Sequence, residues 1–183
     1  TGWTYERIEC DADRLPALVA GLGPEWVGLS VTMPGKFAAL RLADERTERA
    51  ERVGSANTLV RTGAGWRADN TDIDGVVGAL GTVSGAAIVL GSGGTAPAAV
   101  AGLAALGVHD VTIVARNADR VAALLDLGAG LGLHARHRPL EHDALTAAVA
   151  ESGALISTVP ADVAAAYADV LAPIPVLLDA IYD

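Results

Sequence analysis

The stretch AAIVLGSGGTAPAAVAGLAALG, residues 86–107, decides the fold of this chain. Residues 86–90 are a short apolar run that predicts a buried strand, and the alanine-rich residues 97–107 predict a helix. The loop GSGGTA, residues 91–96, joins them. In such a loop Gly91 allows a tight turn, Gly93 lets a pyrophosphate approach the backbone, and the amides at the helix start face the phosphates. The stretch therefore indicates a dinucleotide site, although a glycine triplet alone also fits an ordinary strand-to-helix turn.

The sequence beyond this loop alternates between short apolar runs and helical segments. Strands are expected at residues 86–90, 111–115, 133–135, 155–158 and 176–179. Strands that alternate with helices are joined by right-handed crossovers and form a parallel sheet. We therefore expect a Rossmann-like α/β domain over residues 81–183, with a boundary in the glycine-containing residues 80–85.

Residues 1–80 predict a second α/β domain of different character. Strands are expected at residues 3–9, 27–32, 58–61 and 66–68. A charged helix is expected over residues 37–52, with charge pairs four residues apart at Arg41/Glu45, Glu45/Arg49 and Glu48/Arg52. This spacing is typical of a helix face that is exposed to solvent.

The composition argues against several classes of protein. The 13 basic and 22 acidic residues give a net charge of −9, which disfavours nucleic-acid binding. No apolar run approaches the roughly 18 residues that span a bilayer, so no membrane partner is expected. The single cysteine, Cys10, and the lack of a secretory leader predict a cytoplasmic protein. The four histidines show no metal-ligand spacing, so no metal site is expected; they are His109, His134, His137 and His142.

The second expected strand of the Rossmann-like domain predicts which nucleotide binds. The run VTIVA, residues 111–115, ends without the acidic residue that would bind the ribose 2′-hydroxyl of NAD. Arg116, Asn117 and Arg120 follow instead, and guanidinium groups there would bind a 2′-phosphate through charge-assisted hydrogen bonds. This favours NADP. The alternative is that both arginines are merely exposed and that Asn117 is a helix cap.

Three polar clusters in the first half end apolar runs: SVTMPGK at residues 30–36, GSANTL at 54–59 and ADNTDIDG at 68–75. Such side chains suit a polyhydroxylated small molecule. Lys36 is the single lysine beside 12 arginines, and an ammonium, unlike a guanidinium, can release a proton near working pH. Asp72 could orient that ammonium or cap a helix that starts near residue 73. Thr32 and Asn57 could equally form turns.

Taken together, the motifs resemble the shikimate dehydrogenase family. The resemblance runs in order along the chain through SVTMPGK, GSANTLV, NTDIDG, LGSGGTA, ARNADR, STVP and DAIY. It implies NADPH-dependent reduction of 3-dehydroshikimate to shikimate by a two-domain α/β protein. By the same resemblance, Lys36 and Asp72 match the catalytic pair.

The resemblance also assigns binding positions. Substrate-binding positions are matched by Thr32, Asn57 and Tyr182. Cofactor-binding positions are matched by Gly91, Ser92, Gly93, Gly94, Thr95, Ala96, Arg116, Asn117, Arg120, Thr158 and Ile181.

The chain departs from the family pattern in several places. Ser30 stands where asparagine is common ahead of Val-Thr, and Ser55-Ala56 precedes Asn57. The family's serine pair for the substrate carboxylate would precede Thr1, and its glutamine-bearing segment would follow Asp183. Because the sequence also lacks an initiator methionine, we expect both domains to be partial.

Two alternatives to the expected function stay open. One is a broader quinate/shikimate dehydrogenase, and the other is an inactive NADP-binding sensor of the same fold. The presence of Lys36 and Asp72 disfavours the sensor. The partner expected is a small-molecule substrate, and the sequence leaves a homodimer open.

Overall fold

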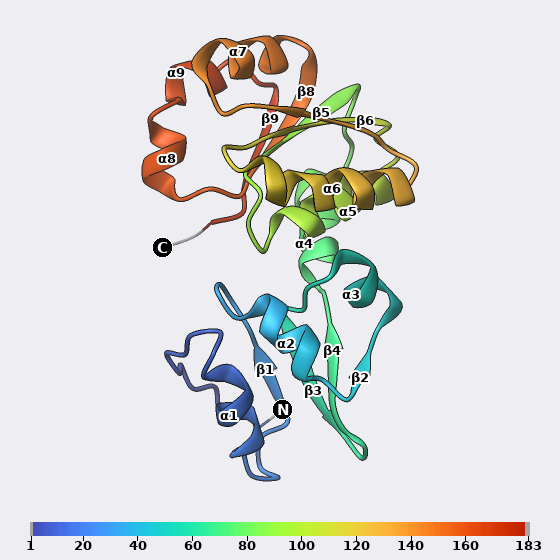
Figure 1. Ribbon diagram of the computed structural model, residues 1–183, viewed down its shortest axis with the longest axis vertical. Helices are drawn as coiled ribbons and strands as arrows, with labels where there is room; N and C mark the ends of the chain where they lie inside the picture. The colour runs from blue at the N-terminus through green and yellow to red at the C-terminus, as the bar shows by residue number, and fades with distance from the viewer. Residues whose placement is uncertain (1, 182–183) are drawn as a thin grey trace. The chain divides into compact units, whose positions relative to one another are not determined.

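The chain divides into two compact units between Asn70 and Thr71. The computed structural model describes residues 2–181 (Figure 1). The division falls before helix α4 (Asp72–Leu80), because Val76 and Leu80 of that helix pack into the core of the second unit. The assignment of separate functions to residues 1–80 and 81–183 stays a prediction.

The second unit is built on a parallel five-stranded sheet, as the sequence predicts. The strand order is β7-β6-β5-β8-β9, and every neighbouring pair is parallel. The strands are β5 (Ala86–Leu90), β6 (Asp110–Val114), β7 (His134–Arg138), β8 (Ser152–Ser157) and β9 (Val176–Asp179). The helices that follow α4 are α5 (Ala96–Ala105), α6 (Ala118–Gly130), α7 (His142–Ala150), α8 (Ala161–Ala165) and α9 (Ala168–Leu171).

Helices cover both faces of this sheet (Figure 1). Ala87 and Val89 of β5 pack on the side of α4, α5 and α6, whereas Ile88 and Leu90 pack on the side of α7 and α9. Burial on both faces explains why the strand is apolar at every position. Small residues let the helices approach closely, since a Cβ at Gly102 of α5 would lie 2.5 Å from Cγ1 of Val76.

The sheet is doubly wound. From the central strand β5 the chain moves to β6 and β7 on one side and then crosses to β8 and β9 on the other. The direction reverses between β5 and β8, and open α/β sheets bind ligands at the carboxyl ends of the strands at such a reversal. The loops after β5 and β8 are therefore the expected place for a ligand in this unit.

The first unit contains a mixed four-stranded sheet of order β1-β3-β4-β2. Its strands are β1 (Gly28–Ser30), β2 (Glu45–Arg46), β3 (Thr58–Thr62) and β4 (Gly65–Asp69), and its helices are α1 (Leu15–Ala20), α2 (Lys36–Leu42) and α3 (Glu48–Val53). The core lies between α1, α2 and the sheet and includes Leu15, Leu59 and Trp66. Arg61 places its guanidinium carbon 4.2 Å from the Trp66 ring centroid and donates a hydrogen bond to the Leu22 carbonyl.

The long charged helix predicted over residues 37–52 is wrong. The chain leaves α2 after Leu42, pairs with β4 as β2, and re-enters a helix at Glu48. The Trp66 amide donates to the Asp44 carboxylate (2.8 Å), and the Thr47 hydroxyl caps α3 by accepting from the Ala50 amide. Only Glu48 and Arg52 of the expected pairs share a helix, and they form an ion pair.

The strand predicted at residues 3–9 is also wrong, because this segment has no regular structure. A strand needs a neighbouring edge and an apolar face to bury, yet the side chains of Trp3 and Tyr5 are 73% and 81% exposed. The remaining strand predictions agree with the structure to within a few residues.

Candidate functional site

The glycine-rich loop follows the central strand β5 and opens helix α5. Gly91 has a φ of +109°, and its amide donates to the Val114 carbonyl of β6 (2.8 Å). The loop then turns through Gly93, whose carbonyl accepts from the Ala96 amide (3.1 Å), and Pro97 lies in the first turn of the helix. Proline suits that position because its missing N–H would have no helical partner there. Ser92 and Gly93 remain partly exposed, while Gly91, Gly94, Thr95 and Ala96 are buried.

Thr158 lies against this loop from the end of β8. Its amide and its Oγ1 both donate to the Leu90 carbonyl, at 2.8 and 2.9 Å. A Cβ at position 91 would lie 2.5 Å from Thr158 Oγ1 and 2.9 Å from Cγ1 of Val159. The positive φ and this close approach both require glycine at position 91. The two loops therefore form one surface at the carboxyl ends of adjacent strands.

The chain after β9 reaches the same strand end as Thr158. The Ala180 amide donates to the Ser157 carbonyl (2.9 Å), and the Ile181 amide donates to the Asp179 carboxylate (3.0 Å). The structure thus places Ile181 beyond a strand that neighbours β8. Tyr182 falls outside the described residues.

The residues expected to select the nucleotide follow β6. Arg116 and Arg120 are both exposed, and no acidic residue ends the strand. Asn117 caps α6, because its Oδ1 accepts from the Arg120 amide (3.0 Å). His137 is a neighbour that the sequence did not indicate, with its Nε2 3.1 Å from the Ala115 carbonyl oxygen. No pattern in the sequence around His137 indicates this contact with Ala115.

In the first unit the structure brings together three of the predicted site residues. Lys36 begins α2 and is only 7% exposed, whereas Thr32 is exposed in the loop after β1 and Asn57 is half-buried just before β3. Backbone hydrogen bonds join these segments. The Ala56 amide donates to the Lys36 carbonyl (2.9 Å), and the Val31 amide donates to the Asn57 carbonyl (2.6 Å). The polar clusters at residues 30–36 and 54–59 therefore form one local structure.

Asp72 belongs to the second unit, where it is the first residue of α4 and is half-buried. The helix begins one residue earlier than expected, with Thr71 at the N-cap position. Asp72 is therefore not the cap. A carboxylate in the first turn is favoured by the helix dipole.

Asp69 and Arg49 of the first unit form a charged pair that the sequence analysis missed. Arg49 donates through Nε to Asp69 Oδ1 and through Nη2 to Oδ2, both at 2.7 Å, and the Thr47 hydroxyl also donates to Oδ1 (2.7 Å). The hydrogen bonds from Arg49 are the main cause that lowers the pKa of Asp69 from 3.8 to about 2. The four-residue spacing in the sequence predicts a pair between Arg49 and Glu45. No local pattern indicates the pair with Asp69, which lies 20 positions away.

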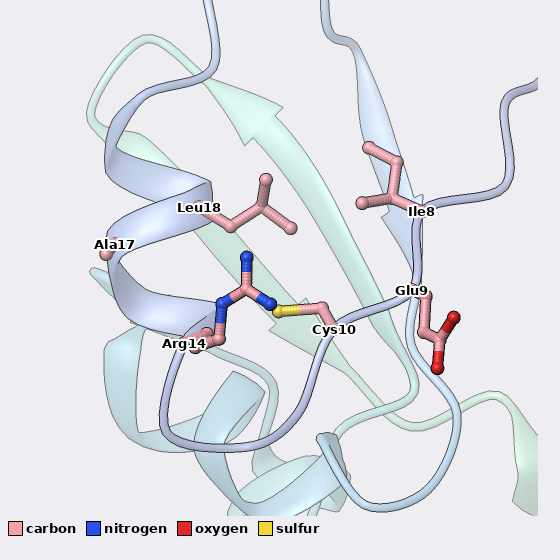
Figure 2. Close-up of a pocket in the computed structure, with 6 residues that line it drawn as sticks. All are labelled: Ile8, Glu9, Cys10, Arg14, Ala17 and Leu18. Carbon is pink, nitrogen blue, oxygen red and sulfur yellow. The ribbon is translucent and has the colours of Figure 1, made fainter.

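The first unit also contains a hollow of about 310 Å³ (Figure 2). It is formed by a segment that precedes the predicted site residues in the chain. It is lined by Ile8, Glu9, Cys10, Arg14, Ala17 and Leu18, and none of these is a predicted site residue. Figure 2 shows the Glu9 carboxylate pointing away from the other five labelled side chains. Among residues 2–181 no group of three His, Cys, Asp or Glu side chains is placed to hold a metal ion. No helix in that range has the length and apolar character needed to cross a membrane.

The fold and its loops define the class of protein: a Rossmann-like α/β unit with a glycine-rich loop at its central strand, joined to a smaller mixed α/β unit. A family model for the shikimate dehydrogenase substrate binding domain matches residues 1–59. The crystal structure of Mycobacterium tuberculosis shikimate dehydrogenase is 68% identical, with a TM-score of 0.94, and the match covers 100% of this chain and 70% of that one. The chain belongs to the shikimate dehydrogenase family.

Two further relatives extend the comparison. A Synechocystis protein named shikimate dehydrogenase (NADP(+)) is 33% identical over 168 residues, which cover 88% of this chain and 58% of the relative. The Thermus thermophilus shikimate 5-dehydrogenase, solved in complex with NADP(H) and shikimate, is 28% identical with a TM-score of 0.67; the match covers 82% of this chain and 54% of that one. The chain thus spans somewhat more than half the length of the curated relatives that it matches.

Proposed function

We propose that this chain carries the cofactor-binding part and the acid/base residues of an NADP-dependent shikimate dehydrogenase, which reduces 3-dehydroshikimate to shikimate. The observation that carries the proposal is the burial of Lys36, the single lysine, where the loop after β1 meets the loop before β3. The names of the relatives support the substrate and the cofactor.

The residues of the second unit fit NADP. The loop from Gly91 to Ala96 lies at the start of a ten-residue helix, and its residues Ser92 and Gly93 are partly exposed. Backbone amides and the positive end of the helix dipole suit a pyrophosphate. Arg116 and Arg120 supply positive charge after β6, where NAD-specific proteins place a carboxylate. Thr158, Ile181 and Tyr182 are assigned to the nicotinamide and substrate side.

The residues of the first unit, together with Asp72, bind the substrate and move the proton. NADPH, when bound, supplies the hydride for the C3 carbonyl carbon. The Lys36 ammonium donates a proton to the carbonyl oxygen as that carbon is reduced, and the Asp72 carboxylate favours the ammonium form and orients it. Thr32 and Asn57 hold the ring hydroxyls through hydrogen bonds. General acid catalysis of this kind contributes a factor of about 10² to 10⁴ in rate.

The proposal is tested by following NADPH oxidation with 3-dehydroshikimate in the full-length protein. Lys36→Ala should lower kcat by roughly 10² to 10⁴ while the affinity for NADPH barely changes. Arg41→Ala changes an exposed cation on the same helix and serves as the matched control, with unchanged kcat expected. Wild-type turnover in Lys36→Ala would contradict the role of Lys36.

The same assay separates the other candidate functions. NADPH binding without turnover would indicate the sensor, and equal rates with quinate would indicate the broader dehydrogenase. We place the reaction in the cytoplasm, as the sequence predicts, with a small-molecule substrate as the partner.

A further inference from the structure

Asn70 and Ser55 are in contact in the interior of the first unit, and both are fully buried. The Asn70 Nδ2 donates two hydrogen bonds to Ser55, one to its carbonyl oxygen at 3.0 Å and one to its Oγ at 3.2 Å. The two residues lie 15 positions apart, at the end of β4 and at the start of the loop before β3. The side-chain amide therefore joins the two polar clusters at residues 54–59 and 68–75.

The backbone of Asn70 is itself held in place. Its amide donates to Asp69 Oδ1 at 2.8 Å, and the Asp69 carboxylate also accepts the two hydrogen bonds from Arg49. A carboxylate that accepts from a guanidinium through both oxygens has a fixed orientation. The backbone from which the Asn70 side chain extends is therefore held by the hydrogen bond to Asp69.

The loop that Asn70 holds is short and connected to the predicted site residues. Ala56, next to Ser55, donates its amide to the carbonyl of Lys36, and Asn57 accepts at its carbonyl from Val31. A shift of Ser55 would therefore be transmitted to Lys36 and Asn57 through the adjoining peptide units. The Asn70 amide is the side-chain group that donates hydrogen bonds to Ser55.

Asparagine is required here for its donors. The Asn70 Oδ1 is buried, and it has no hydrogen-bond partner among the described residues. A buried acceptor without a partner is unfavourable, and an apolar residue of similar size would avoid that cost. Aspartate has the same shape, but it would direct an oxygen toward the Ser55 carbonyl oxygen. Asparagine differs from both in that its amide N–H groups donate to the carbonyl oxygen and the Oγ of Ser55.

We propose that Asn70 is a positioning residue of the active site, whose side-chain amide fixes the loop from Ser55 to Asn57 and thereby sets the positions of Asn57 and Lys36. The catalytic consequence rests on the proposed function, in which these two residues act on the substrate. The local consequence, a loop ordered by Asn70, is independent of that function.

The test compares Asn70→Asp with wild type in the full-length protein by three readouts. Hydrogen exchange of the Ala56 and Val31 amides should accelerate at least about tenfold, because both bonds depend on the loop. The kcat/KM for shikimate should fall roughly 10- to 100-fold, since small misplacements of reacting groups cost that much. The KM for NADP⁺ should change less than about twofold, because the cofactor residues belong to the second unit.

Two further variants keep the outcome decisive. Ser55→Ala removes only the hydroxyl acceptor and keeps the carbonyl, so the fall in kcat/KM should be smaller than in Asn70→Asp; this milder variant also serves if Asn70→Asp does not fold. Val19→Ala weakens the same core from α1 and reports a merely structural effect. It should lower the Tm without selective exchange at Ala56 and Val31.

The results separate the two proposals. The positioning role would be overturned if, for the same loss of Tm, Asn70→Asp and Val19→Ala changed the exchange rates and kcat/KM by the same amount. Wild-type exchange rates and kcat/KM in Asn70→Asp would also overturn it. Wild-type protein without shikimate-dependent NADP⁺ reduction would overturn the proposed function instead. In that case faster exchange at Ala56 and Val31 in Asn70→Asp would still establish the ordered loop.

Discussion

Thr158 donates two hydrogen bonds to one acceptor, the carbonyl oxygen of Leu90, through its amide and its hydroxyl (2.8 and 2.9 Å). This carbonyl belongs to the last residue of β5, immediately before the glycine-rich loop. The contact fixes the rotamer of Thr158, so that its Oγ1 occupies the space where a side chain at position 91 would begin. The geometry of the proposed nucleotide loop is therefore set from the neighbouring strand.

Gly91→Ala should destabilise the protein and weaken NADPH binding. The left-handed backbone costs roughly 1–2 kcal/mol for alanine, and the overlap with Thr158 adds roughly 1–3 kcal/mol. Gly107→Ala is the matched control, because Gly107 has a φ of +76° but a Cβ at this position would meet nothing within 4 Å. Urea unfolding and fluorescence titration with NADPH measure the two effects. Equal losses of stability in both variants would show that the overlap with Thr158 is unimportant.

Thr158→Ala should partly rescue Gly91→Ala, since it removes the atom that lies closest to the new Cβ. A double-mutant cycle should therefore give a favourable coupling of about 1 kcal/mol between the two substitutions. Additive effects would mean that Val159, at 2.9 Å, dominates the overlap.

Replacing Arg116 and Arg120 with leucine should abolish the preference for NADP over NAD, because both guanidinium groups are assigned to the 2′-phosphate. The ratio of kcat/KM for the two nucleotides measures this preference. Arg52→Leu with Arg67→Leu removes the same charge from exposed positions of the first unit and should leave the ratio unchanged. A ratio that survives the first pair of substitutions would place the phosphate elsewhere.

Substitutions of Asn117 can separate its observed cap from its predicted contact with the nucleotide. Asn117→Ala should cost about 1 kcal/mol of stability, because the Arg120 amide loses its acceptor. Asn117→Ser keeps a capping oxygen and should retain most of that stability. If Asn117 also contacts the cofactor, both variants should weaken NADPH binding, whereas a cap alone predicts weaker binding only in Asn117→Ala.

Asp69 should make the stability of the protein depend on acid pH. Its pKa is about 2 in the folded state, below the ordinary value of 3.8, mainly because of the hydrogen bonds from Arg49. The carboxylate therefore stabilises the fold above about pH 4, and this contribution is lost as the pH falls toward 2. Asp69→Asn should cost roughly 1–2 kcal/mol at pH 7, allowing for solvent screening, and progressively less between pH 4 and 2.

Glu48→Gln is the control for Asp69, because it breaks an ion pair in which the Glu48 side chain is 84% exposed. Such a pair contributes under about 1 kcal/mol. Unfolding titrations at about pH 7, 4 and 2.5 should show the pH-dependent difference for Asp69→Asn alone. A constant difference at all three values would contradict the assigned pKa.

Much of the second unit is predictable from its sequence because local signals and tertiary structure agree there. Strand β5, the turn at Gly91 and helix α5 each follow from a short pattern, and burial on both faces leaves the strands apolar throughout. The first unit is less predictable. The charged residues 37–52 satisfy a helical pattern, but pairing with β4 overrides it and makes Glu45 a strand residue.

The candidate site divides in the same way. Lys36 and Asn57 stand out in the sequence because of their residue types and because they lie within polar clusters that end apolar runs. The contacts that hold the surrounding segments do not stand out in the sequence. The hydrogen bond from Asn70 to Ser55 joins residues 15 positions apart, and the ion pair of Arg49 with Asp69 joins residues 20 positions apart. Such contacts arise from the register of β3 and β4, which pairs Thr58 with Asp69.

The hydrophobic core around Leu59 and Trp66 shares no residue with the two cores that cover the parallel sheet. Each half of the chain is therefore stabilised by a hydrophobic core of its own. We therefore expect heat or denaturant to unfold the two halves in separate transitions, and a substitution in one interior to lower the midpoint of its own transition first.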